Sequence, residues 1–361
     1  MTLKTSAFFA PTSAFALVLA TSGAVALAAT SARGQCPADL DASGVVNGAD
    51  LAGVLAAWGP CAQCSEDLDG DGVVTGSDLG QVLVAWGECP VTVPSWATLV
   101  EAQPDPAVVT DPALRAAIAA TGLAWRVRDT ATQVEMLLVP PGTFQMGCIM
   151  GSNQFGCYGH ELPVHQVTLT NALYLGRYEV TQSQWLARMG SNPSGFQGYS
   201  DSANRPVEQV SWDTIQGYLS ATGFRLPTEA EWEYACRAGT QTPFHSGPGF
   251  PNGTTDDGLL SQIAWFLCVD GCSTKPVGGK AANAFGFHDM LGNVHEWVND
   301  WYGSHSAAAQ TDPTGPAYGG NRVVRGGAWN AGAEHVRSSS RYNGTPGDSN
   351  NGIGFRVARD P

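Results

Sequence analysis

The sequence predicts an α+β domain rich in loops, preceded by a small module of two helices and two calcium-binding loops. Three observations lead to this fold class: an acidic tandem repeat near the N-terminus, short capped helices mixed with short strands, and 44 glycines and 11 tryptophans among 361 residues. Hydrophobic residues make up 43% of the chain, so it can bury a sizeable core. The formal net charge is −14, and we expect no nucleic-acid partner because phosphate binding needs a basic surface.

Residues 1–35 have the layout of a signal peptide. Lys4 precedes an apolar run over residues 14–29, and small-x-small sites such as Ala26-Leu27-Ala28 lie near the end of that run. A transmembrane anchor is the alternative, but the run is rich in small residues, and no later stretch reaches the roughly 18 apolar residues of a span. We therefore expect an exported protein that is periplasmic, extracellular or at the cell surface, with no membrane span after signal removal.

Residues 36–90 contain two copies of one acidic motif, which match at 16 of 26 positions with a period of 28. Each copy places oxygen-bearing residues at positions 1, 3, 5, 7, 9 and 12 of a loop, with Gly44 or Gly72 at the turn in position 6. A hard cation with six or seven oxygen ligands, such as Ca²⁺, needs this spacing. The predicted ligands are Asp39, Asp41, Ser43, the Val45 carbonyl, Asn47 and Asp50 in the first loop, and Asp67, Asp69, Asp71, the Val73 carbonyl, Thr75 and Asp78 in the second.

Each loop is followed by apolar residues at helical spacing, so we expect two short helices whose apolar faces pack together. The apolar residues are Leu51, Val54, Leu55 and Trp58 after the first loop, and Leu79, Val82, Leu83 and Trp86 after the second. The cysteines that bracket the two copies have the same 25-residue offset. This offset predicts one disulfide per copy, Cys36–Cys61 and Cys64–Cys89, and pairing that crosses between the copies is the alternative.

This pair of loops resembles a type I dockerin, the calcium-dependent module that docks enzymes onto cohesin-bearing scaffolds. The resemblance implies a cohesin-like or cell-surface scaffold as a partner. Partner choice in dockerins lies at loop positions 10 and 11, which here are the small residues Gly48-Ala49 and Gly76-Ser77. Those positions and the cysteine brackets are the two departures from the dockerin pattern.

Residues 91–124 are predicted to be a linker with one short helix. The segment has three prolines between positions 94 and 106 and few large apolar residues. Asp111-Pro112 supplies an N-cap and a first-turn proline for a helix that runs to about residue 120. The main domain is then expected over 125–361, starting with short strands at 125–128, 134–139 and 143–146.

Three helices are expected in the main domain, at 182–189, 212–221 and 229–237. The first and third begin at capping boxes, Thr181 with Gln184 and Thr228 with Glu231, and Ser211 caps the second. After residue 240 the chain is mostly Gly, Asn, Pro and aromatic residues, with short strands expected at 322–325 and 355–358. Cys236, inside the third helix, is expected to be a buried free thiol.

Seven motifs stand in order between residues 133 and 359. They are VPPGTF with MG (139–147), YEVT (178–181), RPV with VSW (205–212), RLPTEAEWE (225–233), DMLGNVHEW (289–297), RGGAW (325–329) and GFR (354–356). This segment resembles the sulfatase-modifying-factor family, whose type member is the formylglycine-generating enzyme. The resemblance implies a C-type-lectin-like α+β fold dominated by loops.

The type enzyme of the family oxidises a sulfatase cysteine to formylglycine with O₂ and a copper(I) ion bound by two cysteines. In the family these cysteines lie three and eight residues after the serine of an Arg-Gly-Gly-Ser motif. In this sequence the serine position is Ala328 and the cysteine positions are Ala331 and Val336. Alanine and valine offer no soft ligand, so we expect no copper and assign no catalytic residue.

The remaining cysteines and one carboxylate cluster have other expected roles. Cys148 with Cys157 and Cys268 with Cys272 are close in sequence and are expected to form disulfides. By the resemblance, the carboxylates of Asp289 and Glu296 and the carbonyls of Gly292 and Val294 form a structural Ca²⁺ site. A turn held by a salt bridge is the alternative for that cluster.

The segment from residue 329 to 351 corresponds to the exposed site of the lectin-like fold. Here it mixes aromatic, basic and amide side chains, a composition that favours recognition of a glycan or protein ligand. The predicted ligand-binding residues are Trp329, Asn330, His335, Arg337 and Tyr342. We favour ligand or surface recognition; the alternatives are a formylglycine-generating oxidase that works by another route and a purely structural surface protein.

Overall fold

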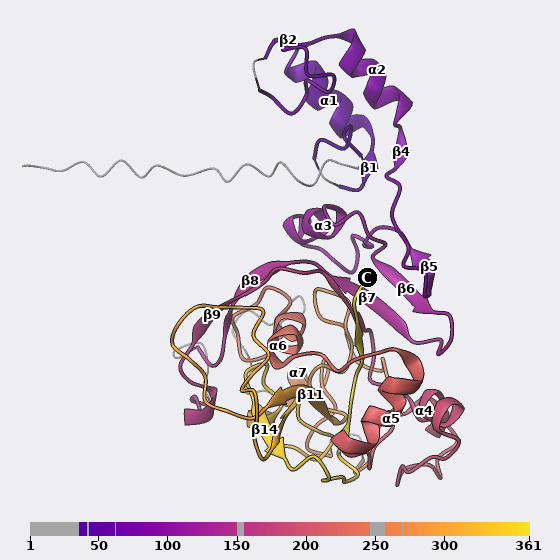
Figure 1. The fold of residues 1–361 in the computed structure, drawn as a ribbon, viewed down its shortest axis with the longest axis vertical. Helices are drawn as coiled ribbons and strands as arrows, with labels where there is room; N and C mark the ends of the chain where they lie inside the picture. The colour runs from indigo at the N-terminus through magenta and orange to yellow at the C-terminus, as the bar shows by residue number, and fades with distance from the viewer. Residues whose placement is uncertain (1–35, 42, 62, 150–154, 246–256, 269–270) are drawn as a thin grey trace, which may run out of the picture. The chain divides into compact units, whose positions relative to one another are not determined.

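The computed structural model describes residues 36–361 except 42, 62, 150–154, 246–256 and 269–270 (Figure 1). The predicted signal peptide lies outside these residues. Within the described ranges, no helix is both long and apolar enough to cross a membrane.

Two helices follow the acidic loops, as the sequence predicts. α1 (Gly48–Ala56) begins after Asn47 and α2 (Gly76–Val84) after Thr75. At each start, the N-cap side chain and the aspartate three positions later accept hydrogen bonds from each other's backbone N–H, which forms a capping box. The same aspartates, Asp50 and Asp78, are therefore helix caps as well as the last residues of the predicted ion loops.

Short strands join the two copies of the repeat. β1 (Val45–Val46) pairs with β4 (Gly87–Glu88), and β2 (Gly59–Pro60) pairs with β3 (Val73–Val74). Each loop thus pairs with the strand that follows the helix of the other copy. The two copies are therefore interlocked by these strand pairs and are not two separate consecutive units.

Because the two copies interlock, the cysteines of the repeat pair differently from the prediction. The disulfides are Cys36–Cys89 and Cys61–Cys64, so the prediction of one bridge per copy was wrong and the alternative of crossed pairing holds. The pairing of β1 with β4 brings the first and last cysteines together, because Cys89 directly follows Glu88. The local pairs Cys148–Cys157 and Cys268–Cys272 are confirmed, and Cys236 is a buried free cysteine as expected.

The apolar faces of the two helices pack together only in part. Val54 and Val82 are fully buried, together with Val46 and Val74. The outer half of each predicted face stays exposed. Leu55, Trp58, Leu83 and Trp86 are 52%, 54%, 54% and 51% exposed. A module this small has no second layer to cover both halves of a helical stripe.

The main domain is built on a five-stranded antiparallel sheet in the order β16-β10-β7-β6-β5, of which Figure 1 labels β5, β6 and β7. Its strands are β5 (Ala97–Glu101), β6 (Arg126–Asp129), β7 (Glu135–Val139), β10 (Leu173–Gly176) and β16 (Ala358–Arg359). β5 lies in the segment predicted to be a linker, so that prediction was wrong: the segment contributes an edge strand. The strand expected at 355–358 is shifted, because residues 355–357 separate β15 from β16.

Two further sheets complete the main domain. A four-stranded sheet has the order β14-β13-β11-β15, and a three-stranded sheet has the order β12-β9-β8. The first contains β11 (His295–Trp301), β13 (Arg322–Arg325), β14 (Arg341–Gly344) and β15 (Ile353–Gly354); the second contains β8 (Gly142–Met146), β9 (His165–Leu169) and β12 (Gln310–Thr311). β13 has the predicted bounds, whereas β9, β10, β11 and β14 were not predicted.

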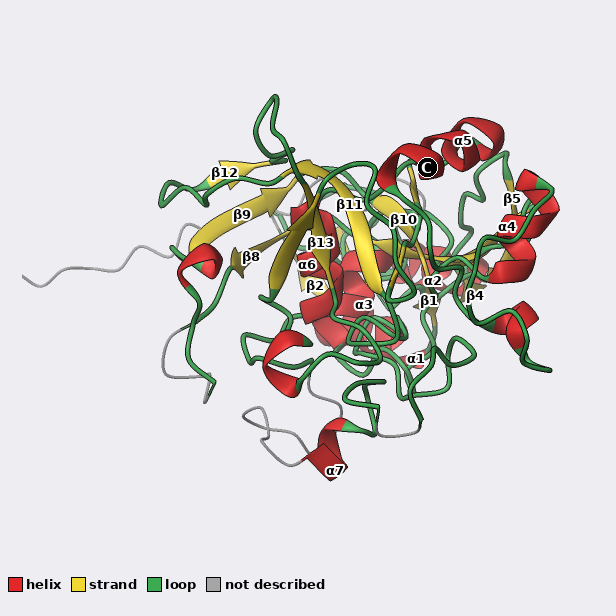
Figure 2. Ribbon diagram, turned by 90° about the horizontal axis from the view of Figure 1, so that it is seen from below, coloured by secondary structure: helices red, strands yellow, loops and turns green. Residues whose placement is uncertain are grey.

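The helices of the main domain agree closely with the sequence analysis. They are α3 (Pro112–Ala119), α4 (Gln182–Met189), α5 (Trp212–Thr222), α6 (Glu229–Arg237) and the short α7 (Asp257–Leu260). The expected caps Thr181, Ser211 and Thr228 all accept from the third backbone N–H of their helices. α4 and α5 lie side by side at the edge of the domain (Figure 2).

Buried arginine–glutamate pairs run through the core beside its aromatic residues. Arg325, Arg337 and Arg356 are among the largest fully buried side chains, with Trp125, Trp232 and Trp297. Each of these arginines, and also the buried Arg341, faces a glutamate from a distant part of the chain. The pairs are Arg325–Glu233, Arg337–Glu161, Arg341–Glu229 and Arg356–Glu296. Charge pairing therefore connects elements that are far apart in the sequence, such as α6 with β13 and β14.

Candidate functional site

The positions that hold thiols in the family are filled here by apolar packing. Ala328 and Val336 are fully buried, and Ala331 packs against the same core. Gly327 has φ +77°, and a Cβ there would lie 2.4 Å from Cγ1 of Val336, so only glycine fits beside this valine. The residues present do not fit copper(I), because methyl and isopropyl groups replace the soft donors that would bind it.

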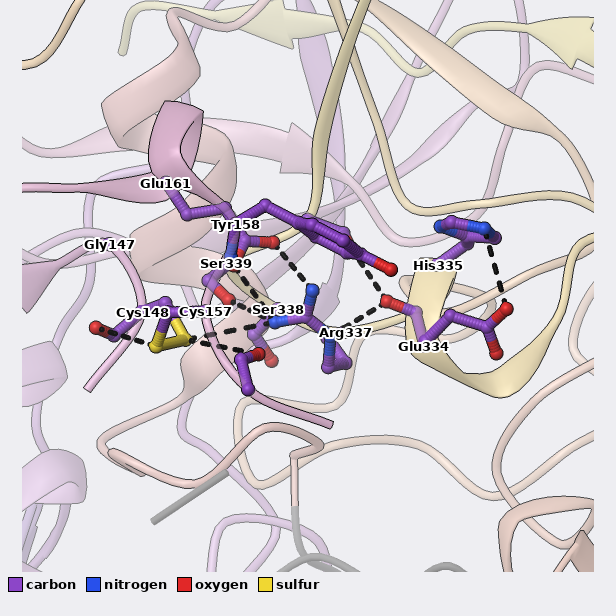
Figure 3. Close-up of polar contacts among 12 residues, drawn as sticks. Gly147, Cys148, Cys157, Tyr158, Glu161, Glu334, His335, Arg337, Ser338 and Ser339 are labelled. Atoms are coloured by element: carbon purple, nitrogen blue, oxygen red, sulfur yellow. Dashed lines mark hydrogen bonds and ion pairs between the residues drawn. A yellow bond between two sulfur atoms is a disulfide. The ribbon is translucent and has the colours of Figure 1, made fainter. Parts of the chain in front are cut away.

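A cluster of aromatic rings includes His335, the residue before Val336, and Tyr158, whose ring lies near it (Figure 3). The ring of Tyr158 stacks between those of His160 and His335, at centroid distances of 5.6 Å and 6.2 Å. The hydroxyl of Tyr342 is hydrogen-bonded to Nδ1 of His335. Burial, with the phenol of Tyr158 nearby, raises the pKa of Tyr342 to about 12, so this hydroxyl keeps its proton. Tyr158 itself is 39% exposed, which leaves an aromatic surface open to a ligand.

Trp329 and Asn330 form a second part of the predicted site. The indole N–H of Trp329 donates to the carbonyl of Asn351 at 3.0 Å, and its ring meets Phe196 edge-on at 5.5 Å. Trp329 is half-buried and Asn330 is exposed. The indole is thus held in one orientation while part of it remains accessible.

The structure does not place Arg337 on this surface, contrary to the prediction. Arg337 is fully buried, and its guanidinium makes a bidentate ion pair with Glu161 at 2.7 and 3.0 Å (Figure 3). Its Nε also donates to the carbonyl of Glu334 at 2.7 Å. Arg337 therefore fastens the segment that carries Tyr158 to the segment that carries His335. It positions the rings and cannot touch a ligand directly.

The sequence analysis missed the contribution of residues 158–161. Tyr158, His160 and Glu161 are about 175 residues before His335 in the chain, and no motif or spacing relates the two segments. The one available signal was the Cys148–Cys157 disulfide, which lies directly before Tyr158. A disulfide between cysteines that are close in sequence predicts a closed loop. It does not show which segment that loop packs against.

A cavity of about 490 Å³ lies on the same domain and was also not predicted. Its lining includes Asp300, His165 and His305, and the two imidazole rings are 4.9 Å apart. Burial, and then the neighbouring Glu229, raise the pKa of Asp300 to about 8. Burial lowers the pKa of His305 to about 4. Asp300 and His305 are therefore largely uncharged at neutral pH, beside the ion pair of Glu229 with Arg341 that also lines the cavity.

The loops of the repeat bring their carboxylates together. Asp39, Asp41 and Asp50 have oxygens within 4.8 Å of one another, and so do Asp67, Asp69 and Asp71. Backbone N–H groups of each loop donate to the first aspartate, for example from Gly44 and Gly72 at 2.7 and 2.8 Å. Other predicted ligands are less available: the Val45 carbonyl accepts from the side chains of Ser43 and Asn47. The remaining predicted ligands, Val73, Thr75 and Asp78, line the end of the second loop, where Asp78 caps α2.

The predicted calcium cluster of the main domain divides into two parts. Glu296 accepts a bidentate pair from Arg356 and the indole N–H of Trp232, as the salt-bridge alternative expects. Asp289 is buried, and its Oδ1 has no hydrogen-bond partner while Oδ2 accepts from Gly278 N–H at 2.6 Å. Burial raises the pKa of Asp289 to about 6. An orphaned buried carboxylate oxygen beside the Gly292–Val294 turn is what an oxygen-binding cation would satisfy.

Comparisons with known proteins agree with the fold of the main domain. Residues 123–361 match the model of the sulfatase-modifying factor enzyme 1-like domain. The chain belongs to this family. A serine/threonine-protein kinase pkn1 from Chlamydia pneumoniae is 33% identical over 255 residues, which cover 63% of this chain and 38% of the relative. The formylglycine-generating enzyme of Mus musculus is 32% identical over 201 residues, which cover 49% of this chain and 51% of the enzyme.

A solved structure supports the same assignment. Treponema denticola variable protein 1 superposes with a TM-score of 0.56 and 29% identity, covering 63% of this chain and 95% of that protein. The main domain therefore has the mixed helix-and-strand fold of the formylglycine-generating-enzyme group. The chain spans about two fifths to one half of the length of the curated relatives named above.

Proposed function

We propose that the main domain recognises a ligand through Tyr158, Trp329, His335 and Tyr342 and does not form formylglycine by the family mechanism. The observation that carries this proposal is the apolar packing at Ala331 and Val336, where the family has its copper-binding thiols. A pseudoenzyme of this kind keeps the fold and loses the chemistry. Neither side chain can bind copper(I) or attack a substrate thiol.

The chemistry of the face suits a glycan or a protein surface as the ligand. Tyr158 and Trp329 offer accessible ring area at a small cost in side-chain entropy. Asn330, His335 and the Tyr342 hydroxyl add hydrogen-bonding groups around the rings. The Arg337–Glu161 pair beneath them supports preorganisation, because it links the two segments that carry the rings.

We also propose that residues 36–90 are a dockerin-like module that binds two Ca²⁺ ions and attaches the exported protein to a cohesin-like or cell-surface scaffold. Two triads of aspartates support this, in a segment with nine acidic residues and no lysine or arginine. A third Ca²⁺ is proposed at Asp289, with the Gly292 and Val294 carbonyls and with Glu296 shared with Arg356. The unpartnered Oδ1 of Asp289 supports that site.

A second candidate function is formylglycine formation by an unexpected route. It is favoured by the 32% identity to the mouse formylglycine-generating enzyme. This function would need a redox metal or a reactive thiol at a place other than Ala331 and Val336. A purely structural role would need neither chemistry nor a binding face.

The first experiment tests the loss of oxidation. Purified protein would be incubated with a peptide carrying the Cys-x-Pro-x-Arg sulfatase signature, Cu(I), reductant and oxygen, and the mass of the peptide measured. We expect an unchanged peptide beside a working formylglycine-generating enzyme. Conversion of the cysteine to formylglycine would overturn the proposal and establish another oxygen-activating site.

The second experiment tests recognition with a glycan array and with the same peptide by fluorescence anisotropy. The variant combines Trp329→Ala, His335→Ala and Tyr342→Ala, and the matched control is Tyr318→Ala, a tyrosine that is 87% exposed elsewhere on the domain. We expect the triple variant to lose at least tenfold in affinity, roughly the effect of removing an aromatic anchor, and the control to bind normally. Equal binding by the triple variant and the control would contradict the assigned face.

A further inference from the structure

We propose that the Cys268–Cys272 disulfide is a thiol-exchange site that captures cysteine-containing peptides or small thiols as mixed disulfides. Four disulfides are present in the described part of the chain. Of their eight cysteines, Cys272 is the one whose residue is exposed, and Cys268 is half-buried. Accessibility to an attacking thiolate is the first requirement for disulfide exchange.

The backbone holds this disulfide against the segment that contains the family's thiol positions. The N–H of Leu267 donates to the carbonyl of Ala331 at 2.9 Å, and the N–H of Cys268 donates to the carbonyl of Trp329 at 2.8 Å. The domain therefore retains a pair of sulfur atoms beside Ala331, although they come from a different part of the chain. These sulfurs belong to none of the motifs that define the family.

The backbone before the disulfide adopts a conformation that is unusual for its residues. Leu267 and Cys268 have φ values of +48° and +56°, in the left-handed region that non-glycine side chains rarely adopt. Strained backbone of this kind persists where the surrounding structure enforces it and is concentrated at functional sites. Here the two hydrogen bonds to Trp329 and Ala331 enforce it.

The chain after Cys272 is anchored as well. The guanidinium of Arg205, which is 4% exposed, donates to Oγ of Ser273 at 3.2 Å and also to the carbonyl of Thr274. Both ends of the disulfide are thus fastened to the domain independently of the S–S bond. Once the bond opens, the two sulfurs stay near each other, so the freed thiolate can attack the mixed disulfide and release the captured thiol.

The exchange needs no external oxidant, because one S–S bond forms as another breaks. The thiolate of the incoming molecule attacks Sγ of Cys272, a new S–S bond forms, and the Cys268–Cys272 bond breaks. The electron pair of the broken bond leaves on Sγ of Cys268 as a thiolate, and the proton of the incoming thiol is released to solvent. Attack occurs at Cys272 because Cys268 is the more covered of the two residues.

This site goes beyond the proposed recognition function and does not depend on it, since a small thiol needs no binding face. The test uses reduced glutathione with the folded full chain, followed by alkylation with N-ethylmaleimide and peptide mass spectrometry. We expect glutathione on Cys272 and maleimide on Cys268. The matched control within the chain is Cys148–Cys157, another local disulfide, in which Cys148 is 2% exposed. It should react at least about tenfold more slowly because its sulfurs are less accessible.

Two variants make the outcome decisive. Cys268→Ser removes the resolving thiol, so glutathione on Cys272 should accumulate and no longer be released; Cys272→Ser should abolish capture. Glutathione needs no binding face, so a failure to exchange is distinguishable from a failure of the proposed recognition. Equal modification of Cys148–Cys157, capture on Cys268 instead of Cys272, or no modification of either would overturn the proposal.

Discussion

The N-terminal repeat and the main domain differ in whether basic side chains accompany their clustered carboxylates. Residues 36–90 hold nine acidic residues and no lysine or arginine, and the loops crowd aspartates within 4.8 Å of one another. In the main domain, four buried glutamates each face an arginine from a distant segment. The main domain carries its own counter-charges, whereas residues 36–90 contain none. Stability should therefore depend on the solution in one region and on long-range pairing in the other.

The largest expected effect is the loss of a counter-charge inside the main domain. Arg325→Met removes one of the two arginines that pair with the buried Glu233, leaving Arg237 at 2.7 Å, and it also removes the donors to the carbonyls of Ser338–Ser340. We expect a loss of about 3–5 kcal/mol in the free energy of unfolding, measured by urea denaturation. The control is Arg128→Met, whose guanidinium is 42% exposed and should cost less than about 1 kcal/mol. Equal losses for the two variants would contradict the view that buried arginine–glutamate pairs stabilise the main domain more than exposed pairs do.

Removal of calcium should have the next largest effect, confined to the repeat. A ligand present at about a thousand times its dissociation constant stabilises the folded state by roughly 4 kcal/mol, and chelation removes that contribution. Calorimetry with EDTA should show the transition of the repeat move to lower temperature while that of the main domain changes little. Adding back Ca²⁺ should restore the transition, and adding Mg²⁺ should restore it less well. Identical circular dichroism with and without chelator would contradict a calcium module.

The same contrast explains which parts could be predicted from the sequence. The starts of α1 and α2 were predictable because the partners in each capping box lie within three residues of one another. The caps of α4, α5 and α6 were predictable for the same local reason. The strand Arg322–Arg325 also has the predicted bounds. Family motifs then located the main domain and the missing thiols at Ala331 and Val336. Local chemistry and motif order therefore gave the helices and their caps and only some of the strands.

What the sequence could not reveal depends on pairing between distant segments. β5 looks like linker because only its pairing with β6 makes it a strand, and its residues are mostly half-exposed. The crossed disulfides follow from the interlocking of β1 with β4, which no offset between cysteines encodes. Arg337 resembles a surface residue of a polar loop until Glu161 is placed beside it. In each case the deciding partner is tens to hundreds of residues away.

A smaller loss of stability should distinguish the buried face of α2 in the repeat from its exposed face. Val82 is fully buried and the adjacent Leu83 is 54% exposed. Val82→Ala should cost about 2 kcal/mol in the transition of the repeat, because it leaves a cavity beside Val54 and Val74. Leu83→Ala should cost less than about 0.5 kcal/mol. A large loss for Leu83→Ala in the calcium-loaded protein would mean that the exposed half of the stripe is covered in solution.

The smallest expected effect concerns a buried carboxylate of the main domain that is bonded to a backbone group. Oδ2 of Asp300 accepts from the N–H of Glu229 at 2.8 Å, and burial, with the Glu229 carboxylate nearby, raises the pKa of Asp300 to about 8. Because the pKa of Asp300 is raised in the folded protein, its protonated form contributes to the free energy of unfolding. This contribution is fully present below the unfolded pKa of about 4 and is lost as the pH rises through 8. Asp300→Asn keeps an oxygen for the N–H of Glu229 and removes the titration. The stability of the variant relative to the wild type should grow by about 1 kcal/mol between pH 7 and pH 8, measured by urea denaturation at both values. A difference that stays constant over this interval would mean that Asp300 is already ionised in the folded protein at pH 7, with an arginine such as Arg341 neutralising it as in the other buried pairs.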